Sequence, residues 1–406
     1  MNILVIGNSE SVHTARFSNA FSKKGHNVCI LSTRVYYGDY VQYDSKIIMI
    51  KYLNWLTAIF QFIFGQKLRD FNPEVSSIIH PMNLLILFRH FYLLCFINVI
   101  IKKVDFDSVF SLNISTSGLY SARIKKKVRK ICKPLGCDLT INKFPRISFF
   151  LDNITYRRNS IKKQNYILAG FKEATEKTYK ILGFLGLTKI EFLGHWGIET
   201  DRFSPSIKSS ELKKQLYNLE KDTILAVCFR QPRTELDFEN IIKAIAKTLK
   251  KYNNLYFAIG TGGTNVGYLI KLAQDLQIEK NLLFIDFIKY EKLNEYIAQG
   301  DIYIDPANIQ KSEAAAVYGI SGSILESMSC GLIPVVSNRP HIKDYLPPEG
   351  NPFIFEDFEV DLPDALEKAI IEKDNQVIKN AMRQAIMDKT NWNNYIDKLL
   401  ILLKEE

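Results

Sequence analysis

Short apolar runs, rich in β-branched residues, recur through the second half of this chain and leave room for a helix between neighbours. The intervening segments, such as 239–251 and 267–276, carry apolar residues at helical spacing. Strands that alternate with helices pair in parallel, because the chain must cross a sheet face before the next strand. The pattern predicts an α/β domain with a doubly wound sheet built from residues 223–229, 255–259, 282–285, 301–304 and 333–337.

The first half of the chain repeats this alternation. A chain of 406 residues with 47% hydrophobic content is too long for one ordinary core and suits two domains. We expect Rossmann-like domains at residues 1–200 and 201–385, followed by an amphipathic helix within 386–406. The strands expected in the first domain are residues 3–7, 27–32, 46–52 and 108–112, with a helix over 12–24.

The segment from the strand at 301–304 to the strand at 333–337 contains a loop of small residues and a short helix with one acid. Gly319, Ser321 and Gly322 let the backbone approach a ligand closely. A helix that begins near Ser321 or Ser323 presents unpaired N–H groups and a positive dipole end to an anion. Glu326, about one turn into that helix, can accept hydrogen bonds from a vicinal diol. The arrangement predicts a site for a diphosphate and a ribose.

A structural interpretation of the same acid is equally open. Ser323-Ile-Leu-Glu326 matches the capping box, in which the acid only reaches back to the helix N-cap. The residues around the helix favour the ligand site.

This segment resembles the donor-binding signature of family-4 glycosyltransferases of the GT-B fold. Residues 325–331 (Leu-Glu-Ser-Met-Ser-Cys-Gly) and 334–336 (Pro-Val-Val) match its second part closely. The family carries an earlier acid eight positions before Glu326, whereas this chain has Tyr318. Between the two expected domains, Gly194 to Pro205 includes Trp-Gly and Phe-x-Pro, as does the family's interdomain segment.

The resemblance implies the GT-B architecture, in which two Rossmann-like domains face a central cleft and the final helix crosses back to the first domain. It also implies transfer of a sugar with retention of configuration and without a metal. The charge of the departing diphosphate then has to be met by basic side chains and a helix N-terminus. Arg230 matches the family's arginine after the first strand of the donor domain, and Arg233 takes the place of its later lysine; both are the expected catalytic residues.

The remaining site residues follow from the resemblance and from the ends of the predicted strands, where an open α/β sheet binds ligands. For His13, capping or packing of the helix is an equally good interpretation. Expected donor-binding residues are Glu326, Tyr318, Gly319, Ile320, Ser321, Gly322, Gly260, Phe287 and Ile288, and expected acceptor or sugar contacts are Gly7, Asn8, His13 and Asp138.

Charge is concentrated in the first half of the chain. Residues 1–200 hold 28 basic and 13 acidic side chains, a net charge of +15, whereas residues 201–406 carry a net charge of −5. The basic run 123–133 is either the solvated face of a helix or a surface for an anionic bilayer or a phosphate-bearing acceptor. No nucleic-acid motif accompanies it. The apolar stretch 82–101 contains Arg89, His90 and Asn98, so core packing or shallow membrane insertion is favoured over a span.

Six scattered cysteines without a Cys-x-x-Cys pair indicate a reducing compartment. The first seven residues predict a buried strand rather than a signal peptide. We expect a cytoplasmic protein that can also lie at the inner face of the membrane. Asp105-Phe-Asp107 is interpreted as the start of a strand, and neither a metal nor a cofactor is expected.

The sequence thus predicts a glycosyltransferase that uses a UDP- or GDP-linked sugar and a glycan or lipid-linked acceptor, in surface polysaccharide or glycolipid synthesis. A nucleotide-sugar epimerase of the same fold, which needs acid/base groups in its cleft, is one alternative. A non-catalytic nucleotide-sugar-binding partner is the other, because Tyr318 replaces the expected acid.

Overall fold

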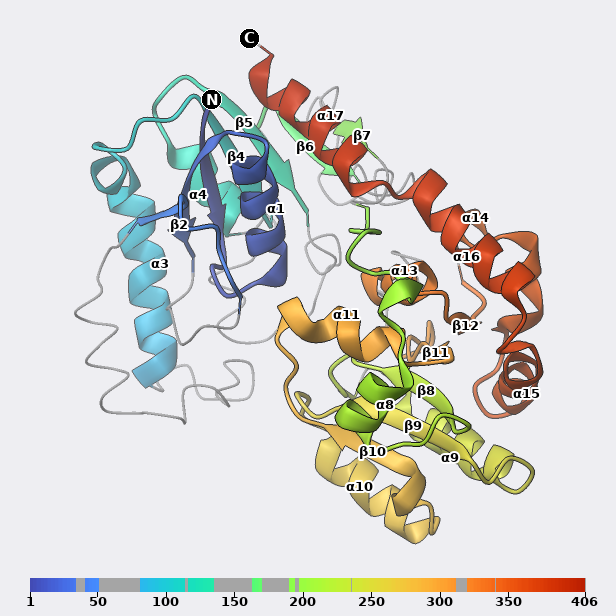
Figure 1. Ribbon diagram of the computed structural model, residues 1–406. Coiled ribbons are helices and arrows are strands. Elements are labelled where there is room, and N and C mark those ends of the chain that lie inside the picture. The colour runs from blue at the N-terminus through green and yellow to red at the C-terminus, as the bar shows by residue number, and fades with distance from the viewer. Residues whose placement is uncertain are drawn as a thin grey trace. The chain divides into compact units, whose positions relative to one another are not determined.

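The chain forms two compact units in the computed structural model (Figure 1). Unit 1 comprises Met1–His195 and Asn394–Glu406, and unit 2 comprises Trp196–Asn393. The structure describes residues 1–33, 41–50, 81–113, 116–134, 163–169, 190–193, 197–234, 236–311, 320–339 and 341–405.

Unit 1 contains a parallel sheet with the strand order β3-β2-β1-β4-β5-β6-β7. Three of the four strands expected here are confirmed almost to the residue. The fourth, expected over 46–52, is present as β3 from residue 48, and its residues 51 and 52 lie outside the described residues. Its strands are β1 (Asn2–Gly7), β2 (Asn27–Ser32), β3 (Ile48–Ile50), β4 (Ser108–Leu112), β5 (Arg129–Lys133), β6 (Tyr166–Ala169) and β7 (Ile190–Phe192).

Helix α1 (Val12–Lys23) begins where the Ser11 side chain accepts a hydrogen bond from the His13 N–H. It packs on the sheet through Phe17 and Phe21, whose rings lie 5.0 and 5.5 Å from that of Phe110 on β4. Two further helices of the unit are α3 (Pro81–Ile100) and α4 (Ser117–Arg123).

The last helix, α17 (Trp392–Lys404), packs within unit 1 from residue 394 onward. The Tyr395 ring lies 6.2 Å from that of Phe17, and Asp397 forms an ion pair of 2.7 Å with Lys24. Helix α17 (red in Figure 1) runs beside β5 and β6, where the Arg129 side chain donates a hydrogen bond of 2.8 Å to the Glu405 carbonyl.

The basic run 123–133 is not the solvated helix face that was one of its two interpretations. Only Arg123 belongs to a helix, and the end of the run is the buried strand β5. Ile131 and Cys132 supply the apolar side chains that a central strand needs. Lys130 is accommodated because its ammonium group donates a hydrogen bond of 2.7 Å to the Ile124 carbonyl.

Unit 2 contains a second parallel sheet, with the strand order β10-β9-β8-β11-β12-β13. All five strands predicted for this half are confirmed. They are β8 (Ile224–Cys228), β9 (Leu255–Gly260), β10 (Leu282–Ile285), β11 (Ile302–Ile304) and β12 (Ile333–Ser337), to which the structure adds β13 (Ile354–Phe355).

The helices of unit 2 connect these strands in the order expected for a doubly wound sheet. Those predicted over 239–251 and 267–276 are present as α9 and α10, displaced by one or two residues. The described helices are α8 (Ser210–Tyr217), α9 (Phe238–Leu249), α10 (Val266–Asp275), α11 (Tyr290–Ala298), α13 (Gly322–Ser329), α14 (Ile342–Tyr345), α15 (Leu362–Glu372) and α16 (Gln376–Lys389).

Each sheet has one position where the strand order changes direction. It lies between β1 and β4 in unit 1 and between β8 and β11 in unit 2. Connections on the two sides of this position leave over opposite faces of the sheet, which opens a crevice at the carboxyl ends of the two strands. The functional residues of each unit are therefore expected at these ends.

Helix α3 packs on the unit 1 core through Leu93 and Ile97, which are fully buried. His90 is also buried, and its Nδ1 atom lies 2.7 Å from the Tyr120 hydroxyl of α4. Burial lowers the pKa of His90 to about 4. Among the described residues, no helix combines the length and apolarity required to cross a membrane.

Acid should destabilise the protein through His90. Its pKa is about 4 when folded against 6.5 for an exposed imidazole, so the stabilising effect of the neutral ring is complete above pH 6.5 and is lost as the pH falls toward 4. His90→Asn keeps a polar atom near Tyr120 but cannot be protonated. Between about pH 7.5 and about pH 5, wild type should lose about 2 kcal/mol more unfolding free energy in urea titrations than the variant. Equal losses would contradict a neutral, buried His90.

Candidate functional site

An ion-pair network joins the carboxyl ends of three neighbouring strands in unit 2. Asp305 follows β11 and is fully buried. Its Oδ1 atom lies 3.3 Å from Nη1 of Arg230, which follows β8, and its Oδ2 atom lies 2.7 Å from Nη1 of Arg339, which follows β12. Arg230 and Asp305 thus meet across the position where the strand order reverses.

The electrostatics of the network fix the charge of Asp305. Burial raises the pKa of its carboxyl, but the guanidinium groups of Arg339 and Arg230 together lower this pKa by more than burial raises it. The net shift of the pKa is therefore downward. The Ala307 N–H also donates a hydrogen bond of 3.2 Å to Oδ2. Asp305 is therefore an anion at neutral pH, and it holds Arg230 with 30% of that side chain exposed. The exposed donors of Arg230 are available to a ligand.

The N-cap residue of helix α13 is Ser321, three residues before Ile324. The capping box considered for Ser323 and Glu326 is therefore not formed, because the N-cap lies two residues earlier and the capping-box position holds an apolar residue. Among the described residues, the backbone N–H groups of Gly322 and Ser323 make no hydrogen bond. A Cβ atom placed on Gly322 would meet open space. The helix start therefore offers free donors beside room for an anion.

Hydroxyl groups hold the start of α13 against the sheet. The Tyr303 hydroxyl of β11 donates a hydrogen bond of 3.0 Å to Ser323 Oγ, which lies 3.1 Å from Ser321 Oγ. Ile320 is buried directly before the helix. Glu326 lies in the second turn and is only 7% exposed. Tyr318 and Gly319 lie outside the described residues.

The loops after β8 and β9 pack closely together. A Cβ atom on Gly263 would lie 1.9 Å from the Pro232 carbonyl oxygen, so only glycine fits there. Gly260, the last residue of β9, faces the Phe229 backbone, with 3.5 Å between its ideal Cβ and the Phe229 carbonyl oxygen. This contact brings the predicted glycine turn next to the residue that precedes Arg230.

Phe287 and Ile288 follow β10, the strand at the edge of the sheet. Phe287 is 58% exposed, so part of its side chain lies at the surface of the unit. The expected donor residues after β10, β9 and β8 therefore lie in a row along one edge of the sheet. Arg233 is exposed and donates a hydrogen bond of 2.7 Å to Gln231. Among the described residues it does not join the Asp305 network.

Three residues of this region were not identified as site residues from the sequence. Asp305 and Arg339 follow predicted strands, and that position is the signal that could have found them. Lys311 forms an ion pair of 2.7 Å with Asp237, the buried N-cap residue of α9. No sequence pattern marks Lys311, because it lies in an irregular loop.

In unit 1, the loop after β1 lies at the corresponding position of the sheet. A Cβ atom on Gly7 would come within 2.7 Å of Thr14 Oγ1, so glycine permits the close approach of α1. Asn8 Oδ1 accepts a hydrogen bond of 3.2 Å from the Glu10 N–H. Its role is thus to shape the turn that leads into the helix.

His13 lies in the first turn of α1. The side chain that caps the helix is that of Ser11, whose oxygen accepts a hydrogen bond from the His13 N–H. Desolvation lowers the pKa of His13 to about 3, with further lowering by the charges of Arg16 and Lys133. Burial also lowers the pKa of Lys133, to about 8. The carboxyl end of the unit 1 sheet therefore combines a neutral imidazole with two basic side chains. Asp138 lies outside the described residues.

The strand-start interpretation of Asp105 and Asp107 is confirmed, because β4 begins directly after them. Asp107 Oδ2 accepts a hydrogen bond of 2.8 Å from the Asn2 N–H, and Asp105 Oδ2 accepts one of 3.0 Å from the Asn2 side chain. Across the described ranges, no three His, Cys, Asp or Glu side chains are grouped so that they could hold a metal ion.

A family model described as "Glycosyl transferases group 1" matches residues 209–385, which extend from α8 into α16. A curated relative is the GDP-mannose-dependent alpha-(1-6)-phosphatidylinositol monomannoside mannosyltransferase of Mycolicibacterium smegmatis. It is 28% identical over 145 residues, or 35% of this chain. The match spans 37% of the relative's own length.

Solved structures resemble the whole chain. Sucrose-phosphate synthase from Thermosynechococcus elongatus has a TM-score of 0.71 at 11% identity and covers 99% of this chain and 98% of its own. HepE from Anabaena, in complex with UDP and glucose, has a TM-score of 0.68 at 13% identity over 100% of both chains. WaaG, a glycosyltransferase involved in lipopolysaccharide biosynthesis, has a TM-score of 0.64 at 13% identity over 100% of both. The expected GT-B fold is confirmed.

Replacement of Arg339 should lower the unfolding free energy of the protein. Its side chain is 1% exposed, so Arg339→Met leaves Asp305 with a single cation in a buried setting and should cost about 3 kcal/mol of unfolding free energy in urea. Lys243→Met, in the exposed Lys243–Glu239 pair, is the matched control and should change stability by less than about 0.5 kcal/mol.

Coupling between the partners provides the second half of this test. Asp305→Asn with Arg339→Met should cost less than the sum of the two single variants, because neither then leaves an unpaired buried charge. Strict additivity, or a loss for Arg339→Met no greater than for Lys243→Met, would contradict the network.

Proposed function

We propose, from the match of residues 209–385 to the family model for group 1 glycosyl transferases, that the protein is a glycosyltransferase. It moves a sugar from a nucleotide diphosphate sugar to a glycan or lipid-linked acceptor, with retention of configuration. The observation that carries this proposal concerns β8 and β11, between which the unit 2 strand order reverses. Arg230 follows β8, and the start of α13 is held to β11 by the bond from Tyr303 to Ser323.

The site suits a diphosphate because it supplies two kinds of donor. The N–H groups of Gly322 and Ser323 donate no hydrogen bond among the described residues, and they carry the positive end of the helix dipole. Arg230 brings a full positive charge, which Asp305 orients. Glu326 is the expected partner for the ribose hydroxyls, and the exposed Phe287 for the base. This assignment requires no cofactor.

The proposed reaction exchanges one bond at the anomeric carbon for another. The bond from this carbon to the diphosphate oxygen breaks, and a bond to the acceptor hydroxyl oxygen forms on the same face. The hydroxyl proton passes to the departing phosphate, so no protein nucleophile is required. Arg230 and the α13 N–H groups stabilise the negative charge that develops on the diphosphate, with Arg233 as the expected second cation.

The nucleotide of the donor is proposed to be uridine or guanosine diphosphate. HepE is described in complex with UDP and glucose, and the mycobacterial relative is named as GDP-mannose-dependent. Unit 1 is proposed to bind the acceptor at the carboxyl end of its sheet, where Lys133 and Arg16 lie near His13. The two basic groups suit a phosphate-bearing acceptor.

We further propose that the protein works in the cytoplasm, at the inner face of the membrane, in surface polysaccharide or glycolipid synthesis. None of the five cysteines that the structure describes forms a disulfide, which supports a reducing compartment. A lipid-linked acceptor would be encountered at that face.

Replacement of Arg230 should impair transfer more than nucleoside binding. Arg230→Gln removes a charge that acts on the departing diphosphate, so turnover should fall by about a hundredfold. The affinity for uridine or guanosine alone should change by less than about twofold. Product formation by mass spectrometry and titration calorimetry measure the two quantities. Arg233→Gln, in the same loop, is the comparison for a neighbouring exposed arginine.

The same reactions separate the competing functions. A changed donor sugar without any acceptor would show an epimerase, and donor binding without release of diphosphate on any acceptor extract would show a non-catalytic binder. An equal loss of turnover and nucleoside affinity in Arg230→Gln would exclude the leaving-group role of Arg230.

A further inference from the structure

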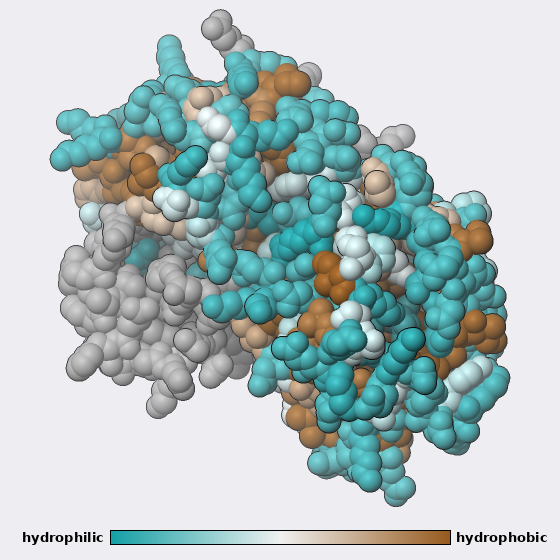
Figure 2. Space-filling model, viewed as in Figure 1, coloured by the Kyte–Doolittle hydropathy of each residue, from teal (hydrophilic) through white to brown (hydrophobic). Residues whose placement is uncertain are grey.

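The solvent-facing side of α3 is apolar along most of its length. Within residues 87–100, each residue that is exposed is apolar. Four of them have large exposed fractions: Phe88 at 52%, Phe91 at 45%, Phe96 at 47% and Val99 at 68%. With 3.6 residues per turn, these four positions fall on one side of the helix. Figure 2 shows hydrophobic atoms gathered on the left of the view, over α3.

The buried side of α3 carries polar residues instead. Arg89 is 6% exposed and His90 is 2% exposed, beside the apolar Leu93 and Ile97. A surface helix of a protein in water normally has the opposite arrangement, with its charges outward. Hydrophobic side chains that form a contiguous exposed patch mark a surface that binds a partner. The exposed side of α3, from Phe88 to Val99, is called the α3 face below.

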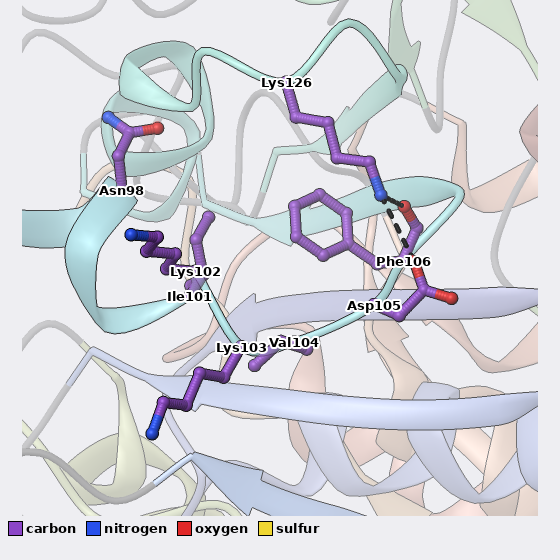
Figure 3. Close-up of a pocket in the computed structure, with 8 residues that line it drawn as sticks. All are labelled: Asn98, Ile101, Lys102, Lys103, Val104, Asp105, Phe106 and Lys126. Carbon is purple, nitrogen blue, oxygen red and sulfur yellow. Dashed lines mark hydrogen bonds and ion pairs between the residues drawn. The ribbon is translucent and has the colours of Figure 1, made fainter.

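A basic pocket of about 440 Å³ adjoins the C-terminal end of α3 (Figure 3). Lys102, Lys103 and Lys126 line it, and Asp105 is its single acidic residue. Lys126 donates a hydrogen bond of 2.6 Å to the Phe106 carbonyl, and its ammonium group lies 4.6 Å from the Phe106 ring centroid. Lys102 and Lys103 are exposed and make no side-chain hydrogen bond or ion pair within the described part of the chain.

The end of α4 and the loop that follows it add further exposed basic residues, among them Arg123, Lys125 and Lys127. Asn98 of α3 fixes this loop to the helix. Its Nδ2 donates a hydrogen bond of 3.0 Å to the Arg123 carbonyl, and its Oδ1 accepts one of 2.8 Å from the Lys125 N–H. The cationic groups therefore keep a constant position relative to the apolar face.

We propose that the α3 face and the adjoining lysines are a docking surface for an anionic lipid bilayer. The phenyl rings enter the boundary between headgroups and acyl chains, and the ammonium groups of Lys102 and Lys103 contact lipid phosphates. A helix of this length, about 30 Å, lies in the plane of the membrane surface. The inference does not depend on the proposed transferase activity.

Charge complementarity selects a bilayer over a second copy of the chain as the occupant. Residues 1–200 carry a net charge of +15, and the lysine cluster borders the apolar face. A second copy would bring the same excess of positive charge to the contact, whereas an anionic bilayer supplies the opposite charge along with an apolar interior. The pocket is large enough for a lipid headgroup phosphate beside its lysines.

The docking surface is separate from the expected acceptor site. Asp105, which lines the pocket, accepts a hydrogen bond from the Asn2 side chain at the start of β1, whereas Gly7 and Asn8 lie at the other end of the same strand. Substitutions on the docking surface therefore leave both expected ligand sites untouched.

Co-sedimentation of the full chain with vesicles tests the proposal. Wild type should pellet with vesicles of phosphatidylglycerol and phosphatidylcholine, should pellet less at high salt, and should remain in solution with phosphatidylcholine alone. Phe96→Glu with Val99→Glu should reduce binding more than tenfold. Lys102→Gln with Lys103→Gln should reduce it by about fivefold for each lysine.

Matched variants in unit 2 control for charge and fold. Ile371→Glu with Val377→Glu introduces the same charge at residues that are 67% and 72% exposed, and should bind vesicles like wild type. Lys271→Gln with Lys280→Gln serves the same purpose for the lysines, which are also exposed. Circular dichroism and thermal unfolding verify that each variant is folded.

Three results would overturn the proposal. The first is wild type that stays in solution with anionic vesicles. The second is a folded variant with Phe96→Glu and Val99→Glu that binds as tightly as wild type. The third is sedimentation velocity showing a wild-type dimer that this double variant converts to monomer, because the α3 face would then be an interface between copies.

Discussion

The unit 2 site depends on the ion pairs that the Asp305 carboxylate forms with two arginines. The carboxylate is fully buried at the end of β11, and it contacts Arg230 from β8 and Arg339 from β12. A single buried carboxylate thereby joins the ends of three adjacent parallel strands. Burial of one anion is costly unless it is paired and hydrogen-bonded, and here two guanidinium groups and the Ala307 N–H satisfy that requirement. The arrangement leaves 30% of the Arg230 side chain exposed.

The backbone around this network explains why the expected ligand residues lie along one edge. Parallel strands end on the same side of a sheet, so the residues that follow β8, β9 and β10 must be neighbours. The sequence pattern was sufficient to predict these strands, since their β-branched runs are bounded by turns and helices. It also predicted the start of α13 near Ser321, because small residues precede an apolar run.

Other features required tertiary contacts that no local pattern contains. Asp305 and Arg339 are 34 residues apart in the chain, and only the pairing of β11 with β12 brings them together. For the run of lysines before Lys133, an exposed helix face was one of two interpretations, yet its apolar residues complete the centre of a sheet as β5. In α3, Arg89, His90 and Asn98 interrupt an apolar stretch, but the sequence cannot show that two of them point inward while the aromatic residues remain exposed.

The central claim is that a nucleoside diphosphate binds to the free N–H groups at the start of α13. Millisecond-resolved hydrogen exchange of the peptide covering residues 320–330, with and without saturating UDP or GDP, tests it directly. Bound diphosphate should slow exchange at Gly322 and Ser323, because their N–H groups then donate hydrogen bonds that they do not make to any described residue. Nucleotide binding that leaves exchange at these two residues unchanged would contradict the account.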